Sequence, residues 1–362
     1  MKKIGLIFQK AWDNKKNILV YGIITIGLLL IAFWAIFPTY SPPWTGFDGY
    51  TKSSSNIERA KTLWDWMNLL IVPLVLAIGA WYLNKTEKNV EQKIAQDRLQ
   101  EERLQKYFDQ MTSLLLNNQL RQSNQDSEAR SIARSITLAT ARGLDSERKK
   151  ILIKFIYESQ LIDLVGVVDL SGIDLSNTNL EHVKLRLSCL PHANFSNSNL
   201  AKASFSNSNL QRANFRKTQL YRTSFVGADL YMSDFSNSNA TKAALADVKL
   251  SFSTLDGCIF SEAHLGKADL SNSSAKKSTF RKAFLENANL QDVDFTGADL
   301  SGANLRFANL RRAKLHKTNL TGADLHGADF RLADLTGAKV ALTELKDSLY
   351  DLCKMPNGKI NA

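Results

Sequence analysis

Cysteine, histidine and proline are scarce in this sequence of 362 residues, and the scarcity excludes several classes of protein. The three cysteines have no paired spacing, which argues against a disulfide scaffold or a zinc site. No two of the five histidines have the spacing of a shared metal site. The motifs G-x-x-x-x-G-K-[ST], G-x-G-x-x-G, H-E-x-x-H and G-x-S-x-G are absent. We therefore expect no catalytic residue, no cofactor and no metal.

Charge is absent from two long apolar runs near the N-terminus, Ile18 to Phe37 and Trp66 to Leu83. Each is long enough to cross a bilayer core of about 30 Å as a helix. A secretory signal is the alternative for the first run, but that run is longer than the apolar core of a signal peptide. We predict transmembrane helices at 18–37 and 66–83, joined by an extracytoplasmic loop at 38–65.

Basic residues are concentrated on one side of the two runs. Five lysines lie in the segment 1–17 and six Lys or Arg follow between 84 and 106, whereas the loop between the runs holds three. Basic residues mark the cytoplasmic side of a membrane protein. We predict a multi-pass protein of a cytoplasmic or internal membrane, with its N-terminus and everything after residue 83 in the cytoplasm.

A charged stretch without proline or glycine follows and predicts a cytoplasmic helical stalk at 84–121. One seam of this helix carries the apolar residues Val90, Ile94, Leu104, Phe108, Met111 and Leu115. Two interpretations of the seam stay open. It forms a coiled coil that pairs two copies as a homodimer, or its second half packs on the two helices expected in the region 122–164. We expect the second of these helices, from Asp145, to cap the domain that follows.

A period of five governs that domain, which we place at 165–347. Every fifth residue from Leu170 to Leu345 is Leu or Phe at 33 of 36 positions, with Ala240, Ala275 and Val340 as exceptions. A small residue lies two positions earlier at 31 of 36 positions. Three residues of each unit therefore alternate in, out and in as a short strand, and the other two form a corner. This pattern fits neither a helix nor a long strand.

Four right-angle corners would close a square coil of twenty residues, with about nine coils stacked at about 4.8 Å per level. Charges at twenty-residue spacing support this register, because Asp229, Lys249 and Asp269 alternate in sign. Cys258 takes a small inward position, so we expect it to serve packing. The segment 348–362 is expected to be a tail that covers the last coil.

The units ADLTGAKV, ANLRFANL and ADLHGADF resemble those of the pentapeptide-repeat proteins. The resemblance implies a right-handed quadrilateral β-helix, and the closing of a coil after four units is taken from it. The segments around 63–100 and 144–162 are similar to the front end of membrane-bound bacterial members of that family. This implies a mixed fold, with two transmembrane α-helices, a helical stalk and a helical cap before the β-helix. It also implies a bacterial membrane, but no particular activity.

Two columns of basic residues border one side of the predicted rod. They contain Lys202, Arg222, Lys242 and Lys282 at one corner, and Lys217, Lys277 and Lys317 at the adjoining corner. Arg216, Lys276 and Arg281 add to these corners. We interpret this basic face as a candidate docking surface for an acidic partner, and a merely solvated surface is the alternative.

Three functions remain to be distinguished. The first is a membrane-anchored scaffold that presents the solenoid to a cytoplasmic protein partner without catalysis. The second, from the resemblance, is a regulatory protein whose basic face binds an anionic partner, such as a lipid surface or a topoisomerase. Nucleic acid itself is disfavoured, because Tyr221 is the lone aromatic residue along the basic columns. The third, an enzyme or transporter, has no supporting motif.

Overall fold

The computed structural model describes residues 63–163, 166–341 and 343–361. The segment 1–17, the transmembrane helix predicted at 18–37 and nearly all of the loop at 38–65 lie outside the described residues. The chain divides into two compact units, Met1–Ile94 and Ala95–Ala362.

Helix α2 (Leu63–Leu116) begins in the first unit and contains Pro73. A helix is therefore present where the second apolar run lies. Seven large apolar residues between Leu74 and Leu83 are exposed there. In the part of the chain that the structure describes, however, no helix has both the length and the apolar character required of a membrane span.

In the second unit, the end of α2 packs on α3 (Glu128–Gly143) and α4 (Ser146–Glu158), with the short 3-10 helix η3 (Leu120–Gln122) between α2 and α3. Leu104, Tyr107 and Met111 are buried, and the Tyr107 hydroxyl lies 3.2 Å from that of Thr137 in α3. The second half of the predicted stalk seam thus packs on the two following helices.

The first half of the seam has no such cover. Val90 and Ile94 are 51% and 47% exposed. Between the two halves, Arg148 of α4 donates to the Glu101 carboxylate at 3.1 Å and approaches Asp97 at 3.7 Å. Asp97 and Glu101, which separate the two halves of the apolar seam, therefore form ion pairs with α4. A coiled coil is not supported.

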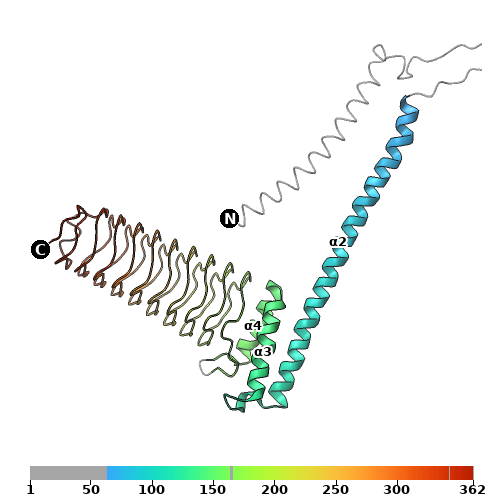
Figure 1. Cartoon of the computed structure of the whole chain (residues 1–362), viewed down its shortest axis with the longest axis horizontal. Helices are drawn as coiled ribbons and strands as arrows, with labels where there is room; N and C mark the ends of the chain where they lie inside the picture. Colours follow the sequence, from blue (N-terminus) through green and yellow to red (C-terminus); the bar gives the residue numbers. More distant parts are fainter. Residues whose placement is uncertain (1–62, 164–165, 342, 362) are drawn as a thin grey trace, which may run out of the picture. The chain divides into compact units, whose positions relative to one another are not determined.

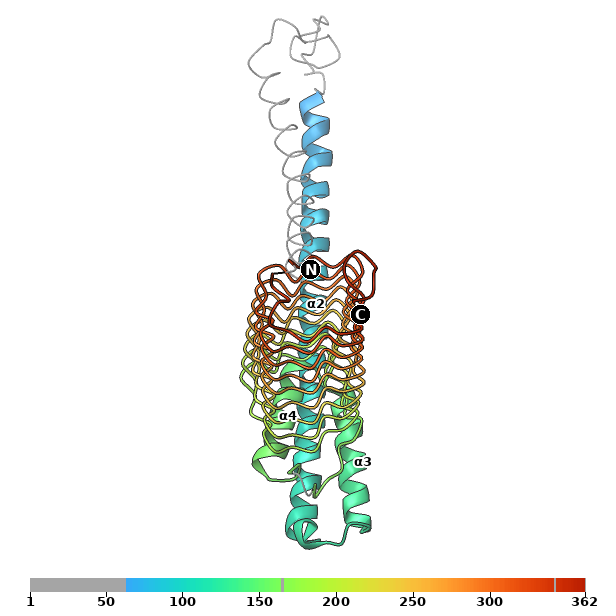
Figure 2. The same cartoon turned by 90° about the vertical axis from the view of Figure 1, so that its left-hand side faces the viewer.

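Residues after Val168 form a stack of coils (Figure 1). Parallel bridges join residues twenty apart, from Asp174 with Asn194 to Asp334 with Lys354. The twenty-residue register is confirmed. Figure 2 shows successive coils nearly in line. The chain takes a positive φ at one residue of almost every five, which gives four corners per coil.

Backbone hydrogen bonds account for this geometry. Taking the corner after Leu190 as an example, the N–H of Ala193 donates across the corner to the carbonyl of Leu190 at 3.3 Å, and the N–H groups of Leu190 and His192 donate to the next coil. Pro191 and His192 occupy the central positions of this turn, and His192 has a φ of 58°. A proline followed by a positive φ is typical of a type II turn.

The inward positions form one core that runs through the whole stack. Nearly all the Leu, Phe and small side chains at those positions are buried. Phe195, Phe215 and Phe235 stack with ring centroids 5.1 and 4.7 Å apart. Buried hydroxyls donate to carbonyls of the preceding coil, as Ser198 does to Leu175 at 2.8 Å. Hydrogen bonds between neighbouring coils thus satisfy buried polar groups, which burial requires.

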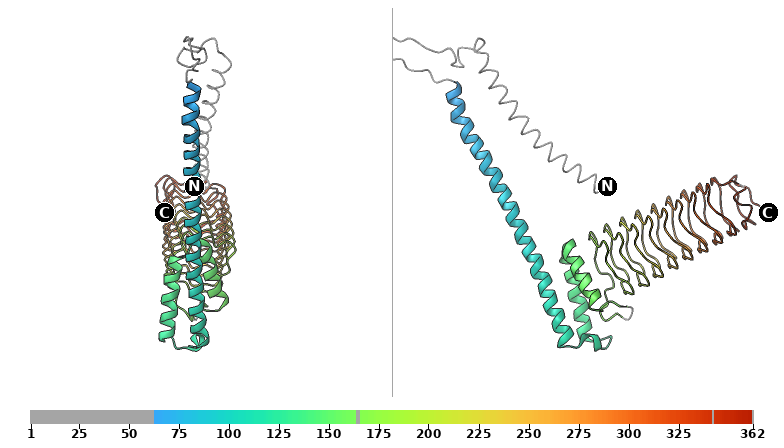
Figure 3. Two further views of the ribbon diagram at one scale, coloured as in Figure 1. Left: turned by 90° about the vertical axis from the view of Figure 1, so that its right-hand side faces the viewer. Right: turned by 180° about the vertical axis from the view of Figure 1, so that it is seen from behind.

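Side chains and helices cover the first coil. Helices α3 and α4, drawn in green, lie against it (Figures 1 and 3). Ser146 accepts a hydrogen bond from the N–H of Asn179 at 2.8 Å, and Lys149, 8% exposed, lies 3.7 Å from Asp174. An open strand edge invites pairing with other chains, and these contacts occupy it.

The last coil ends in a different way. The bridges continue past residue 347, and the Glu344 carboxylate accepts from the N–H groups of Gly322 and Ala341, both at 2.9 Å. Lys354 then pairs antiparallel with Ile360. The tail therefore supplies part of a final coil and a short hairpin, whose backbone pairs with the last edge.

Candidate interaction face of the solenoid

The seven basic residues predicted as a docking surface share one backbone position. Each is the second residue of a corner, with φ between 53° and 58°. They are Lys202, Arg222, Lys242 and Lys282 in one column and Lys217, Lys277 and Lys317 in the other. All are exposed except Lys242, which is half-buried.

Between the two columns runs one side of the coil stack. The outward residues of its strands are Asn179, Asn199, Gln219, Asn239, Ile259, Thr279, Asp299, Asn319 and Lys339, each bridged to the next. We call this side the amide face, because amide side chains dominate it. The Asn199 side chain donates to that of Asn179 at 3.1 Å, and the Asn319 side chain donates to Asp299 at 3.0 Å.

Three cations at the first position of these corners behave differently, because they reach a carboxylate in the next coil. Arg216 lies 3.3 Å from Asp234, and Lys276 lies 3.5 Å from Asp294. Arg281 lies 3.8 Å from Asp299 by the same offset of eighteen residues. The three cations expected to add to the basic corners are therefore paired with carboxylates.

Two of the predicted residues are also paired, but with neighbours at their own corner. Lys202 lies 3.5 Å from Glu181, and Lys242 lies 3.3 Å from Glu262. Among the described residues, the other five have no carboxylate within ion-pair distance. Arg222 lies over the ring of Tyr221 at 5.3 Å, which holds its guanidinium at the surface.

Two levels of the stack carry an unpaired cation at both corners. Lys217 and Arg222 flank one level, and Lys277 and Lys282 flank a level three coils further on. We call these four residues the corner cations. Lys317 stands alone at its level, because Gly322 occupies the other corner. The structure thus brings four of the seven predicted residues together as two pairs.

Ile259 lies between the two levels and is 40% exposed. Gln219 and Asn239 lie on the same stretch of the amide face. Thr241 donates to the Asn239 side-chain oxygen through both its N–H, at 3.2 Å, and its hydroxyl, at 2.7 Å. Within the described residues the Asn239 amide nitrogen and the Gln219 side chain have no partner. This stretch offers hydrogen-bond groups and one apolar side chain inside a frame of four positive charges.

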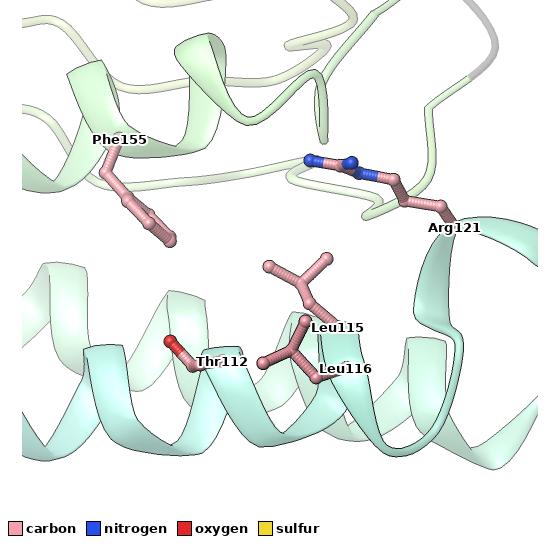
Figure 4. A pocket seen from close by; sticks show the side chains of 5 residues that line it. All are labelled: Thr112, Leu115, Leu116, Arg121 and Phe155. Atoms are coloured by element: carbon pink, nitrogen blue, oxygen red, sulfur yellow. The ribbon is translucent and has the colours of Figure 1, made fainter.

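Other hollows are less suited to binding. A pocket of about 210 Å³ lies between the end of α2 and α4, and Figure 4 shows Leu115, Leu116 and Phe155 on its walls, with Arg121 at one side. It is smaller than typical ligand pockets, which start at about 300 Å³. A second pocket, of about 330 Å³, is lined by Arg130 and Arg134. Arg134 is paired with Asp169 at 3.0 Å there.

In the ranges that the structure describes, nucleophilic and metal-ligating side chains do not form a cluster. Cys258 is buried, and burial raises the pKa of its thiol to about 12. His264 stacks on Phe284 with centroids 4.6 Å apart. Within the described ranges, no three His, Cys, Asp or Glu residues are placed to hold a metal ion.

Comparison with known families agrees with this geometry. The model for pentapeptide repeats matches in 8 copies between residues 168 and 337. The repeat region of the chain therefore belongs to the pentapeptide-repeat family. No curated protein matches the sequence.

Several solved structures are similar to this chain. HetL, a pentapeptide-repeat protein involved in heterocyst differentiation regulation in the cyanobacterium Nostoc, is 25% identical over 58% of this chain and 98% of its own, with a TM-score of 0.29. QnrB1, a plasmid-mediated fluoroquinolone resistance protein, is 23% identical over 48% and 90%, with a TM-score of 0.24. Rfr23 from the cyanobacterium Cyanothece is 19% identical over 48% and 91%, with a TM-score of 0.21. None of these similarities identifies a partner of this chain.

Which of the cations are paired was not predicted from the sequence. The signal was present, because each of Arg216, Lys276 and Arg281 has an aspartate eighteen residues later. Reading charges only at multiples of twenty overlooks this diagonal neighbour. The diagonal contact arises because a first corner residue lies close to the strand that precedes the same corner in the next coil.

Proposed function

We propose that the protein is a scaffold, held at a membrane by its N-terminal part, that binds an anionic partner on the amide face of its solenoid. The observation that carries the proposal is the pairing pattern of the cations. The first-corner cations Arg216, Lys276 and Arg281 are paired within the chain, whereas the four corner cations keep their charge available at one side of the rod. A face of this kind attracts a partner of opposite sign.

The membrane attachment is supported by the apolar runs at 18–37 and 66–83. It is also supported by exposed apolar side chains near the start of α2, including Leu74, Leu76 and Ile78. The basic residues beside the runs support an orientation with the solenoid on the cytoplasmic side. The resemblance to membrane-bound bacterial members of the family supports a bacterial membrane. Alkaline carbonate extraction of membranes that contain the full chain tests the membrane attachment. We expect the chain to stay in the membrane pellet, and its release into the supernatant contradicts the attachment.

Partner binding is tested by crosslinking in native membranes. The wild-type chain is compared with a variant in which Lys217, Arg222, Lys277 and Lys282 are all changed to Glu. We expect a specific set of crosslinked proteins to disappear in this variant, because four attractive charges become repulsive.

A matched control uses the two opposite corners. Arg212 and Lys267 are exposed, occupy the same second corner position and have φ of 57° and 59°. Changing both to Glu alters surface charge elsewhere on the rod. Crosslinks that disappear equally in both variants, or in neither, contradict a role for the amide face.

A further inference from the structure

Ile259 is exposed on a side of the rod whose other outward residues are polar or charged, and it lies within the frame of the four corner cations. Large apolar side chains at the centre of a polar rim are typical of protein interfaces. Lipid headgroups or nucleic acid phosphates make no use of an aliphatic side chain at this place.

The spacing of the cations limits the shape of a partner. The level of Lys217 and Arg222 is three coils from the level of Lys277 and Lys282, which corresponds to about 14 Å at about 4.8 Å per level. An extended chain covers this length with about four to five residues. Carboxylates at both ends of so short a segment reach both charged levels, and a residue between them reaches Ile259.

The remaining groups on this stretch also suit a peptide. Gln219 and Asn239 offer amide groups to a peptide backbone. Two carboxylates lie at these corners. Glu262 is paired with Lys242 at 3.3 Å, and Asp256 accepts from the Ser274 hydroxyl at 2.6 Å and from the N–H of Lys276 at 2.9 Å. A continuous phosphate backbone would meet Glu262 and the nearby Asp299, whereas a peptide can place its charges selectively.

We propose that the amide face binds an extended acidic peptide segment of a partner protein, with carboxylates at the two charged levels and one apolar side chain on Ile259. This inference rests on the proposed function and names the chemistry of the partner. The apolar residue adds a requirement that a merely anionic partner lacks.

The test uses two fluorescent peptides of five residues, with a glutamate at each end and a serine on either side of the central residue, a length matched to the span of about 14 Å. One carries a central Leu and the other a central Ser. Their affinities for the full chain, held in phosphatidylcholine nanodiscs, are measured by fluorescence anisotropy. We expect the Leu peptide to bind about fivefold more tightly, since an apolar contact of this size favours binding by that order.

Two variants separate the contributions. Ile259→Thr should abolish the difference between the peptides, and the same column already accommodates Thr279, so the fold is retained. Changing Lys217, Arg222, Lys277 and Lys282 to Gln should weaken both peptides by about tenfold or more. The Arg212→Gln, Lys267→Gln double variant is the control and should bind like the wild type.

Equal affinity for the two peptides, or no binding of either, overturns the inference. So does tighter binding of phosphatidylserine vesicles or of a single-stranded oligonucleotide, each measured in competition with the Leu peptide. If crosslinked partners are still lost in the Glu variant while the peptides bind equally, the proposed function stands and this inference alone fails.

Discussion

The N–H of the first corner residue has no backbone acceptor in the coil, and an Asp or Asn two residues earlier supplies one. The Asn214 side chain accepts from the N–H of Arg216 at 3.0 Å, and Asp229 does the same for Tyr231 at 3.1 Å. This contact explains the recurrent Asp or Asn of the repeat more fully than solvation of the strand, because it satisfies a donor that the ladder omits.

The second corner residue has a positive φ, which costs a side chain about 1–2 kcal/mol unless it is Gly or, in part, Asn or Asp. The chain nevertheless places Lys, Arg, Phe and Met at these positions. A corner with a side chain at this position is therefore locally less stable than a corner with Gly, but it places that side chain at the outer edge of the rod.

Cys258 gives a prediction at this scale. Its sulfur lies 2.9 Å from the Ser238 hydroxyl, and burial raises the pKa of the thiol to about 12. We expect a thiol reagent at about pH 8 to leave Cys258 unmodified in the folded chain, because the thiolate is the reactive form. Mass spectrometry before and after unfolding measures this. The half-buried Cys189 is the internal comparison, and labelling of Cys258 at the same rate contradicts the prediction.

Two alanines stand at large inward positions of the coil stack, and both are followed by Phe in the next coil. Ala240 precedes Phe260 and Ala275 precedes Phe295 by twenty residues. The rings of Phe280 and Phe295 also meet edge to face at 5.6 Å. A small residue beside a large one keeps the volume of the core constant between levels.

Enlarging such an alanine should therefore destabilise the stack. We expect Ala240→Leu to cost about 1–3 kcal/mol through overpacking. Adding Phe260→Leu should recover part of this loss, because the neighbouring level then has space. Thermal denaturation of the two variants and of Phe260→Leu alone measures the coupling. Strictly additive effects would show that these two levels do not share volume.

The period of five and the register of twenty were predictable, because one small and one large inward residue recur without interruption. The packing of Leu104 and Met111 was not, since one helical seam suits a second copy as well as α3 and α4. The pairing of Arg216 was not predicted, because it depends on a diagonal contact at eighteen residues, which the register of twenty does not indicate. The hairpin at Lys354 and Ile360 lies beyond the repeat, where no periodic signal exists.

Ion pairs within coils and between coils make the stability of the whole molecule depend on pH. Two guanidinium nitrogens of Arg312 donate to the two carboxylate oxygens of Asp292, at 2.7 and 2.8 Å. This hydrogen bonding lowers the pKa of Asp292, and Arg331 lowers that of Asp329 in the same way. A carboxylate whose pKa is lowered by folding stabilises the folded state at pH values above its unfolded pKa. This contribution is lost as the pH falls through the folded pKa.

We therefore expect the thermal midpoint to fall on acidification from about pH 7 to about pH 3. Asp292→Asn should have a lower midpoint at neutral pH and a smaller further loss in acid. Asp247→Asn is the control, because Asp247 has the same corner conformation and no ion pair among the described residues. An equal acid dependence in Asp292→Asn and the wild type contradicts the assignment.

Because each coil has four sides, the number of residues between two outward side chains determines whether they point to the same side of the rod. Deleting one unit of five, such as residues 241–245, would advance every later strand by a quarter turn. Lys277 and Lys282 would then point to a different side from Lys217 and Arg222, although the composition of the surface is almost unchanged. Deleting twenty residues would keep all four in phase and bring the pairs one level closer. An insertion or deletion of whole units in the repeat region therefore rotates all later residues about the axis of the rod. Only changes in multiples of twenty residues keep the outward side chains on their original sides.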